Sequence, residues 1–443
     1  MGIIGELAWT LQSALGSALE EIGRRSRAIR RRRKFTGPTL LRTIVLTAWK
    51  SPGATTDDFV ATAARLGVTV SPQAIEKRFT EPLIAFLRMA LEHVLGHALA
   101  APPAAIPLLR RFTAVELADS STVTVPERYA EEFPGCGGTS DGGKAAVKIQ
   151  LRWDLLGGRL KRLVVEPGRR GDGRNEEAEA PVTRGALYLR DLGYFGLAWF
   201  RELAAAGAYW ISRLQQRTVV LDRDGEPLEL LRTLRGHEGG GPVDMPILLG
   251  KAERLACRLI ALRVPQEMAA RRRQKAYEKA EKQGRMPSRD HLAWCEWTIL
   301  VTNCPGGLLT WKEAVVLYRS RWQVELMFKL WKSHNRLAAY RATWTATERM
   351  AMFWAKLIAV VLQHWILLAS VWTDPRRSLW KAARVIGDWV LTLTGALGDL
   401  DQLVRTLERL VATLAAAARQ KLQKKRPSSF QLLLNPKLLN WNS

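Results

Sequence analysis

The sequence predicts a mixed α/β fold with helical ends and a strand-rich middle. Apolar residues recur at helical spacing near both ends, whereas the middle contains short alternating runs bounded by Gly, Pro and Asp. Residues 311–336 lack Pro and Gly and could form about six helical turns. The pattern predicts five regions. They are a helical region with a basic arm (1–100), the first part of an α/β core (108–214), a β-rich insertion with a basic helix (215–302), helices completing the core (303–372) and a helical C-terminal region suited to dimerisation or internal packing (373–443).

The charge balance predicts a polyanionic partner. The chain has 443 residues and a formal net charge of +25, which favours nucleic acid. Its four cysteines show no CxxC spacing and indicate reduced residues of a cytoplasmic protein. Residues 350–372 are long and apolar enough to span a bilayer, but Lys356, Gln363 and His364 interrupt them. We therefore expect a buried helix and no membrane partner, and the N-terminus shows no signal-peptide pattern.

Two N-terminal features are candidates for binding DNA. Arg24 to Lys34 contain eight basic residues and no acid. Such a run suits an arm that neutralises phosphates, although a solvated basic helix is the alternative. Residues 55–80 loosely resemble a helix-turn-helix, with a turn at Gly67 and an N-cap at Ser71. The candidate DNA contacts are Arg30, Arg31, Arg32 and Arg33 of the arm, and Lys77 and Arg78 of the second helix.

The middle of the chain places two aspartates at expected strand ends. A strand at 113–118 leads into Asp119, and another at 185–190 leads into Asp191. Between them, the predicted strands 145–154 and 159–166 form a hairpin around Gly157-Gly158. A helix at 197–206 and a strand at 209–214 follow, and the insertion supplies strand-like runs at 246–249, 255–264 and 296–301 and a basic helix at 269–283. This element order is that of a ribonuclease H-like domain, in which distant carboxylates can converge.

The uninterrupted helical stretch carries a third acid among cations. At 100° per residue, Tyr318, Arg321, Glu325 and Lys332 lie within about 60° of one another. A carboxylate that binds metal beside two cations that grip phosphate would suit chemistry on a phosphodiester. The alternative is a solvated helix with i,i+4 charge pairs. A nucleotide cofactor is not expected: the glycine-rich run at 138–144 lacks the required Ser or Thr and precedes a strand.

The spacing Y-(2)-R-(3)-E-(6)-K from Tyr318 to Lys332 resembles the signature of bacterial insertion-sequence DDE transposases of the IS-four family. Asp119-Ser-Ser resembles the family's first motif, and Asp191-Leu-Gly-Tyr-Phe its second. The similarity covers roughly residues 30–370. It implies that Asp119, Asp191 and Glu325 are catalytic and bind Mg²⁺, with Mn²⁺ as a substitute.

The same resemblance implies roles for further residues. Tyr318, Arg321 and Lys332 would hold a phosphate, assisted by Trp322. Trp297, which lies 28 residues before Glu325, would stack on a flipped base in hairpin-forming relatives, although a core tryptophan is the alternative. The implied activity is binding of double-stranded transposon ends, metal-dependent cleavage and strand transfer to target DNA by a homodimer, with or without a hairpin intermediate. A non-cutting DNA-binding inhibitor and a ribonuclease H-type nuclease are the competing hypotheses.

Overall fold

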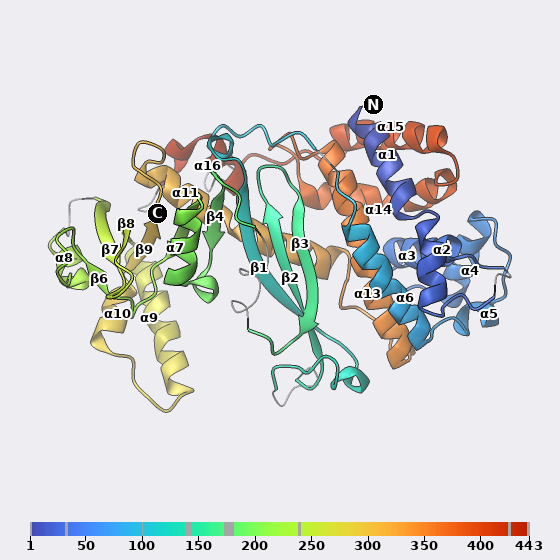
Figure 1. Ribbon diagram of the computed structural model, residues 1–443, viewed down its shortest axis with the longest axis horizontal. Coiled ribbons are helices and arrows are strands. Elements are labelled where there is room, and N and C mark those ends of the chain that lie inside the picture. Colours follow the sequence, from blue (N-terminus) through green and yellow to red (C-terminus); the bar gives the residue numbers. More distant parts are fainter. Residues whose placement is uncertain are drawn as a thin grey trace.

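The computed structural model describes residues 2–31, 34–99, 101–137, 143–171, 181–237, 241–423 and 427–440. In these ranges one nine-stranded mixed sheet runs through the molecule in the order β3-β2-β1-β4-β5-β9-β8-β7-β6. Figure 1 shows the sheet with the insertion at one end of the long axis and a body of helices at the other. The predicted mixed α/β class with helical N- and C-terminal regions is confirmed.

Five strands form the half of the sheet that carries the two motif aspartates. They are β1 (Val115–Thr124), β2 (Ala146–Asp154), β3 (Leu160–Pro167), β4 (Leu187–Arg190) and β5 (Tyr209–Arg213), with α7 (Leu197–Ala205) between the last two. β2 is antiparallel to β1 and β3, whereas β4 is parallel to β1 and β5. The β2–β3 turn uses Gly158 at φ +73°, a conformation that favours glycine. This arrangement is consistent with a ribonuclease H-like domain.

The insertion extends the same sheet. It contributes β6 (Val220–Leu221), β7 (Val243–Leu249), β8 (Leu255–Arg263) and β9 (Trp297–Thr302), with helices α8 (Leu230–Arg235), α9 (Gln266–Glu281) and α10 (Arg289–Trp294). β9 pairs antiparallel with β5 through Ile211 and Thr302, and β8 then pairs with β9. The strands predicted in this region are therefore present, and backbone hydrogen bonds join them to the core sheet.

N-terminal and C-terminal helices share one hydrophobic core, although they are far apart in sequence. The long helix α13 packs on α3 and α6, and α1 packs on α15. The helices are α1 (Ile3–Ala14), α2 (Ala18–Arg25), α3 (Gly37–Lys50), α4 (Thr56–Arg65), α5 (Pro72–Glu76), α6 (Glu81–Leu95), α13 (Ala346–Ser370), α14 (Leu379–Ala396), α15 (Leu400–Ala417) and α16 (Ser429–Leu434). α13 is long and apolar enough to cross a membrane, and its apolar stretch is entirely buried within the protein. The prediction of a buried helix is confirmed.

Side-chain alternation separates the two faces of the sheet. On one face, Val115, Leu117, Leu187 and Leu189 join the large core that also contains the helical body. On the other face, residues such as Tyr188 and Trp210 form a second core beneath α7 and α8. Because alternate residues share a face, Asp119 lies on the same side as Leu117. The helix that carries Glu325 packs against this same face of the sheet.

Three local predictions were wrong. β1 does not end before Asp119: Ser120 to Thr124 continue to pair with β2, because this hydroxylated, partly β-branched run forms a regular antiparallel ladder. The predicted helix 311–336 is α11 (Trp311–Ser320), α12 (Trp322–Lys329) and a π-helical turn, Leu330–His334. At the junction, i to i+3 hydrogen bonds replace the α-helical ones around Arg321. α5 ends at Glu76, so Lys77 and Arg78 lie beyond it.

Candidate active site

The two motif aspartates lie just beyond the paired ends of parallel strands. Pairing of β1 with β4 stops at Leu117 and Leu189, two residues before each aspartate. The backbone N–H of Ser120 donates to Asp119 Oδ1 at 2.8 Å. Asp191 begins the 3-10 turn Leu192–Tyr194, and the Tyr318 hydroxyl donates to its Oδ1 at 3.5 Å. Asp119, Asp191 and Tyr318 of α11 therefore lie together at the end of the paired strands β1 and β4.

Arg321 joins these acids to the third one. Its Nη2 donates to Glu325 Oε1 at 2.7 Å, and its Nη1 lies 3.7 Å from Asp119 Oδ2. The side chain is only 13 % exposed. Burial opposes the guanidinium charge, but Asp191 and Glu325 raise the pKa of Arg321. All three carboxylates therefore act on one cation, although they are spread over about two hundred residues of sequence.

The pKa of Asp119 is raised to about 6. Burial is the main cause, and Glu325 and Asp191 add like-charge repulsion. The Ser120 N–H and Arg321 act in the opposite direction by favouring the carboxylate. A carboxyl group with a raised pKa beside two other acids is typical of a functional site, because a purely structural ion pair would hold the pKa low.

Lys332 and Trp322 lie on the same helical assembly. Lys332 belongs to the π-helical turn and donates from Nζ to the Thr122 carbonyl oxygen of β1 at 2.7 Å, and burial lowers its pKa. Trp322 is 53 % exposed. It lines a cavity of about 340 Å³ together with Tyr318, Arg321 and Met268. This cavity opens beside the acids and has mainly apolar walls.

Trp297 lies on the other side of the sheet. It is 4 % exposed and belongs to the core beneath α7 and α8, whereas its neighbours Thr298 and Leu300 face the cavity beside Tyr318. Strand alternation explains the difference, since successive side chains point to opposite faces. In this structure the Trp297 ring is buried in that core, which is the position that the alternative of a core tryptophan describes.

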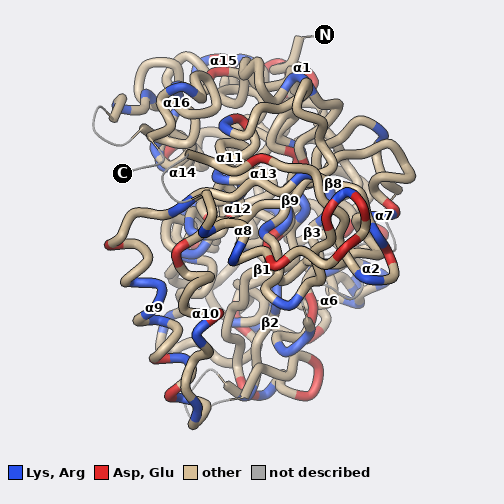
Figure 2. The backbone as a smooth tube through the Cα atoms, turned by 90° about the vertical axis from the view of Figure 1, so that its left-hand side faces the viewer, with Lys and Arg blue, Asp and Glu red and all other residues tan. Residues whose placement is uncertain are grey.

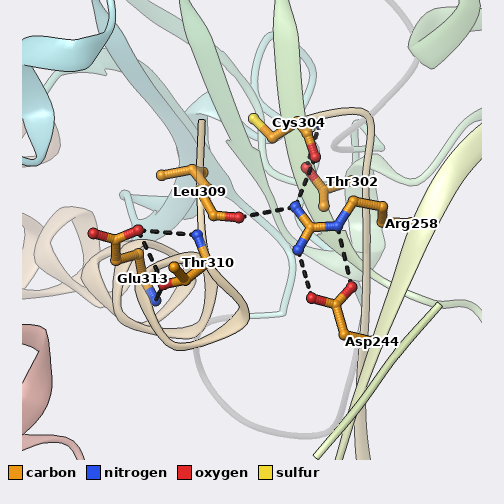
Figure 3. Close-up of polar contacts among 7 residues, drawn as sticks. All are labelled: Asp244, Arg258, Thr302, Cys304, Leu309, Thr310 and Glu313. Atoms are coloured by element: carbon orange, nitrogen blue, oxygen red, sulfur yellow. Dashed lines mark hydrogen bonds and ion pairs between the residues drawn. The ribbon is translucent and has the colours of Figure 1, made fainter. Parts of the chain in front are cut away.

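Hydrogen bonds from the insertion fix the beginning of α11 (Figure 3). Arg258 on β8 donates to the carbonyl oxygens of Cys304 and Leu309, both at 2.9 Å, and pairs with Asp244 at 2.6 Å. Thr310 then caps α11 through a reciprocal capping box with Glu313. The orientation of the helix that presents Tyr318 and Arg321 therefore depends on an arginine of the insertion.

Other acids near the motifs have structural partners. Glu116, whose side chain points away from Asp119, forms a buried ion pair with Arg152 at 2.7 Å. Asp154 accepts N–H groups of Val115, Leu156 and Gly157 at the hairpin end. Glu166 pairs with Arg170 at 3.5 Å. These contacts account for each carboxylate without a catalytic role.

The basic arm and the residues after α5 meet around one concavity, which we call the N-terminal cradle. Arg27, Arg30, Arg31, Lys77 and Arg78 line this cavity of about 650 Å³, and none of its lining residues is acidic. Ile29 is buried in the core, so this part of the arm packs on the protein. Arg78 donates to the Ala28 carbonyl oxygen at 3.3 Å, which holds the two segments together. Arg32 and Arg33, like the basic residues Lys424 to Arg426, lie outside the described residues.

Comparison with known proteins identifies the family. Residues 111–362 match the model of the transposase DDE domain, which is more than half of the chain. The chain belongs to the DDE transposase family. Similar proteins include the transposase for insertion sequence element IS231F of Bacillus thuringiensis subsp. israelensis, 26% identical over 94% of this chain and 92% of that protein. The putative transposase InsL for insertion sequence element IS186A of Escherichia coli (strain K12) is 28% identical over 40% of this chain and 49% of its own length.

DDE transposases generally use divalent metal ions, and the acids of this transposase have suitable chemistry. Carboxylate oxygens are the hard ligands that Mg²⁺ and Mn²⁺ prefer. As they stand, however, no three His, Cys, Asp or Glu side chains within the described ranges are grouped closely enough to hold a metal. The Arg321 guanidinium lies between Asp119 and Glu325 instead. A metal can join these carboxylates only if that ion-pair arrangement changes.

Sequence reasoning missed three arginines around this transposase site. Arg213 of β5 and Arg272 of the insertion line the cavity beside Tyr318, and Arg258 of the insertion supports the start of α11. Arg258 interrupts the apolar interior of the strand LACRLIALR, whose other arginine, Arg263, stands at its end. A charge within such a strand is a usable signal of a buried polar network. Arg213 and Arg272 carry no comparable signal, because basic residues are frequent throughout the chain.

Proposed function

We propose that this transposase binds the terminal inverted repeats of its insertion sequence, cleaves the DNA there and transfers the freed 3′ ends to target DNA. The single observation that supports this proposal best is the gathering of Asp119, Asp191 and Glu325 around Arg321. The protein performs such chemistry in a ribonuclease H-like core formed by residues 108–214 and 303–372. We further propose a cytoplasmic location and a homodimer that holds two DNA ends together.

Each residue of the site has a role in this proposal. Asp119, Asp191 and Glu325 would hold Mg²⁺, for which Mn²⁺ can substitute. When bound, divalent ions would activate a water or a 3′-hydroxyl and stabilise the leaving oxygen. Arg321 and Lys332 bind phosphate oxygens, where Arg321 can use two N–H groups at once. Tyr318 positions Asp191 through its hydroxyl group.

DNA binding is divided between two surfaces in this proposal. The N-terminal cradle supplies cations for the backbone of the terminal repeat, and phosphate contacts set the position of the protein on the duplex. Beside the acids, the exposed Trp322 and the 340 Å³ cavity suit an unstacked base at the cleavage point. A hairpin intermediate would need such a site, and Trp322 fits the stacking role better than the buried Trp297.

The Glu325→Gln variant tests the proposal. Because glutamine keeps the shape of the side chain but removes its charge, end binding should persist while Mg²⁺-dependent cleavage falls by at least about a hundredfold. The assay uses labelled duplex that carries the terminal repeat of the element. Glu281→Gln, an exposed position on α9, is the matched control and should cleave as the wild type does.

The outcomes of this assay separate the competing functions. Wild-type protein that binds the duplex and never cuts it would be a binding inhibitor. Cleavage without joining to a target plasmid would identify a nuclease. Cleavage retained by Glu325→Gln would remove Glu325 from the catalytic set.

A further inference from the structure

The insertion contains a large concavity, which we call the insertion cleft. Its volume is about 1100 Å³, and it lies between the segment that follows β5, helix α8, the second half of α9 and helix α10. Figure 1 shows these helices at the end of the long axis opposite the N-terminal helical body. None of the residues that line this cleft belongs to the candidate active site.

Positive charge dominates the rim of the insertion cleft. Its cations are Arg217, Arg232, Arg235, Lys279 and Arg285, and its acids are Glu229 and Asp290. Arg232 pairs with Glu229 at 3.6 Å, and both side chains are exposed. The other four cations are also exposed and form no ion pair with any residue that the structure describes. Because five cations face only two acids, the rim carries a net positive charge that attracts a polyanion.

The floor of the cleft is partly apolar. Leu228, Leu231 and the half-buried Trp294 lie between the charged positions. Phosphate-binding cations around an aromatic and aliphatic floor suit a nucleic-acid strand, whose bases or sugars cover the apolar surface while its phosphates meet the rim. A chain of net charge +25 that acts on DNA has such a strand as its substrate.

Helix α9 connects this cleft to the active-site cavity. Met268 and Arg272 line the cavity with Tyr318 and Arg321, whereas Ala276 and Lys279 line the cleft. At 100° per residue, these α9 positions fall on one face of the helix, within about 100°. From Arg272 to Ala280 the helix rises about 12 Å, the axial length of three to four base pairs. Figure 2 shows Lys and Arg recurring along α9 on this side of the molecule.

We propose that the insertion cleft binds the backbone of the DNA that flanks the transposon end, beyond the cleavage point. Figure 1 shows α2 and α5, which flank the N-terminal cradle, and α8 to α10, which line the insertion cleft, toward opposite ends of the long axis. Strands β1 and β4, which lead to Asp119 and Asp191, lie between them. A duplex whose terminal repeat occupies the cradle therefore carries its flanking strand past Arg321 and along α9. This inference depends on the proposed transposase function.

A four-residue variant tests the cleft. The variant has Gln in place of Arg217, Arg235, Lys279 and Arg285. Its binding is measured on two duplexes that both contain the terminal repeat, only one of which continues for about ten flanking base pairs. The variant should bind the flanked duplex at least about tenfold more weakly at moderate salt, with a slope of log K against log salt reduced by up to about 3.6. Binding of the pre-cleaved duplex, which ends at the terminal repeat, should match that of the wild type.

Control variants make the result specific. Replacement of Arg376, Arg384, Arg405 and Arg409, which are exposed on the C-terminal helical region, removes the same charge and should leave the preference for flanked DNA intact. If the cleft variant does not fold, Lys279→Gln with Arg285→Gln gives the same test with half the charge change. Unchanged binding of the flanked duplex, or equal losses on both duplexes, would overturn the inference. Failure of the proposed function is distinguishable, because the wild type itself would then not cleave either duplex.

Discussion

Arg321 and Glu325 form a 2.7 Å ion pair within one helical turn, and the same guanidinium lies 3.7 Å from Asp119. Under the proposed function, a metal ion would compete with this guanidinium for the same carboxylate oxygens. We therefore expect metal binding to depend on the position of Arg321, and we expect a DNA phosphate that attracts Arg321 to free the carboxylates for a metal.

Replacement of Arg321 should therefore strengthen metal binding in the absence of DNA. We expect Arg321→Gln to bind Mn²⁺ about tenfold more tightly than the wild type in calorimetry, because no guanidinium competes for Asp119 and Glu325. Cleavage by this variant should nevertheless fall, since phosphate contacts are lost. Lys329→Gln, at an exposed position on α12 that does not line the cavity beside Tyr318, is the control. Weaker Mn²⁺ binding by Arg321→Gln would mean that the arginine supports the metal site instead of competing with it.

The raised pKa of Asp119 predicts a pH-dependent stability. In the folded protein this carboxyl group titrates at about 6, above its ordinary value of 3.8. Between these values the folded state holds a proton that the unfolded state has lost, so this contribution to stability disappears as the pH rises through about 6. Asp119→Asn cannot ionise. Its melting temperature relative to the wild type, measured with chelator present, should increase from pH 5 to pH 7, whereas a constant difference would contradict the assignment.

The two tryptophans near the site should behave differently when truncated. Trp322→Ala removes an exposed ring and should leave the melting temperature within a few degrees of the wild type, while hairpin or cleavage product falls by about five- to a hundredfold. Trp297→Ala removes a buried ring and should cost about 3–5 kcal/mol of stability. Thermal unfolding and a cleavage time course measure both effects. A stable Trp297→Ala protein that lacks only the hairpin product would restore the stacking role to Trp297.

The N-terminal cradle should contribute to affinity and not to chemistry. A variant with Gln in place of Arg30, Arg31 and Lys77 should bind a pre-cleaved end duplex more weakly. The slope of log K against log salt concentration should fall by about 2.7. Arg78 is left unchanged because it holds Ala28 in place. Filter binding at several salt concentrations gives the slope, and Gln at Arg384, Arg405 and Arg409 provides the control. An unchanged slope would show that the cradle does not face the DNA backbone.

Sequence patterns predicted those parts of the site that depend on local structure. Asp191 follows a strand as expected, because a glycine-containing turn comes directly after it. Alternation along β1 also explains why Glu116 faces away from Asp119 and pairs with Arg152. By contrast, the continuation of β1 past Asp119 depends on pairing with β2, which is a long-range contact that no local pattern encodes. The direction of Trp297 depends in the same way on the register of β9 with β5 and β8.

Tertiary packing decided the remaining differences. The run of basic residues predicts a surface arm, yet Ile29 within it is buried in the core, and Arg30 and Arg31 line one cavity with Lys77. The pattern of residues 311–336 predicts one continuous helix, yet the hydrogen-bond pattern changes at Arg321 and again at Leu330. The second change places Lys332 where it donates to the Thr122 carbonyl oxygen. Both deviations bring together residues of the candidate sites, and functional sites are where local sequence rules and the fold are expected to disagree.

Anomalous diffraction from crystals of the protein with end DNA and Mn²⁺ is the most direct test of the catalytic assignment. We predict manganese peaks bonded to carboxylate oxygens of Asp119, Asp191 and Glu325, with the Arg321 guanidinium moved from these oxygens onto a DNA phosphate. Manganese bound to other acids, or an Arg321–Glu325 ion pair that persists beside bound DNA and metal, would contradict the account.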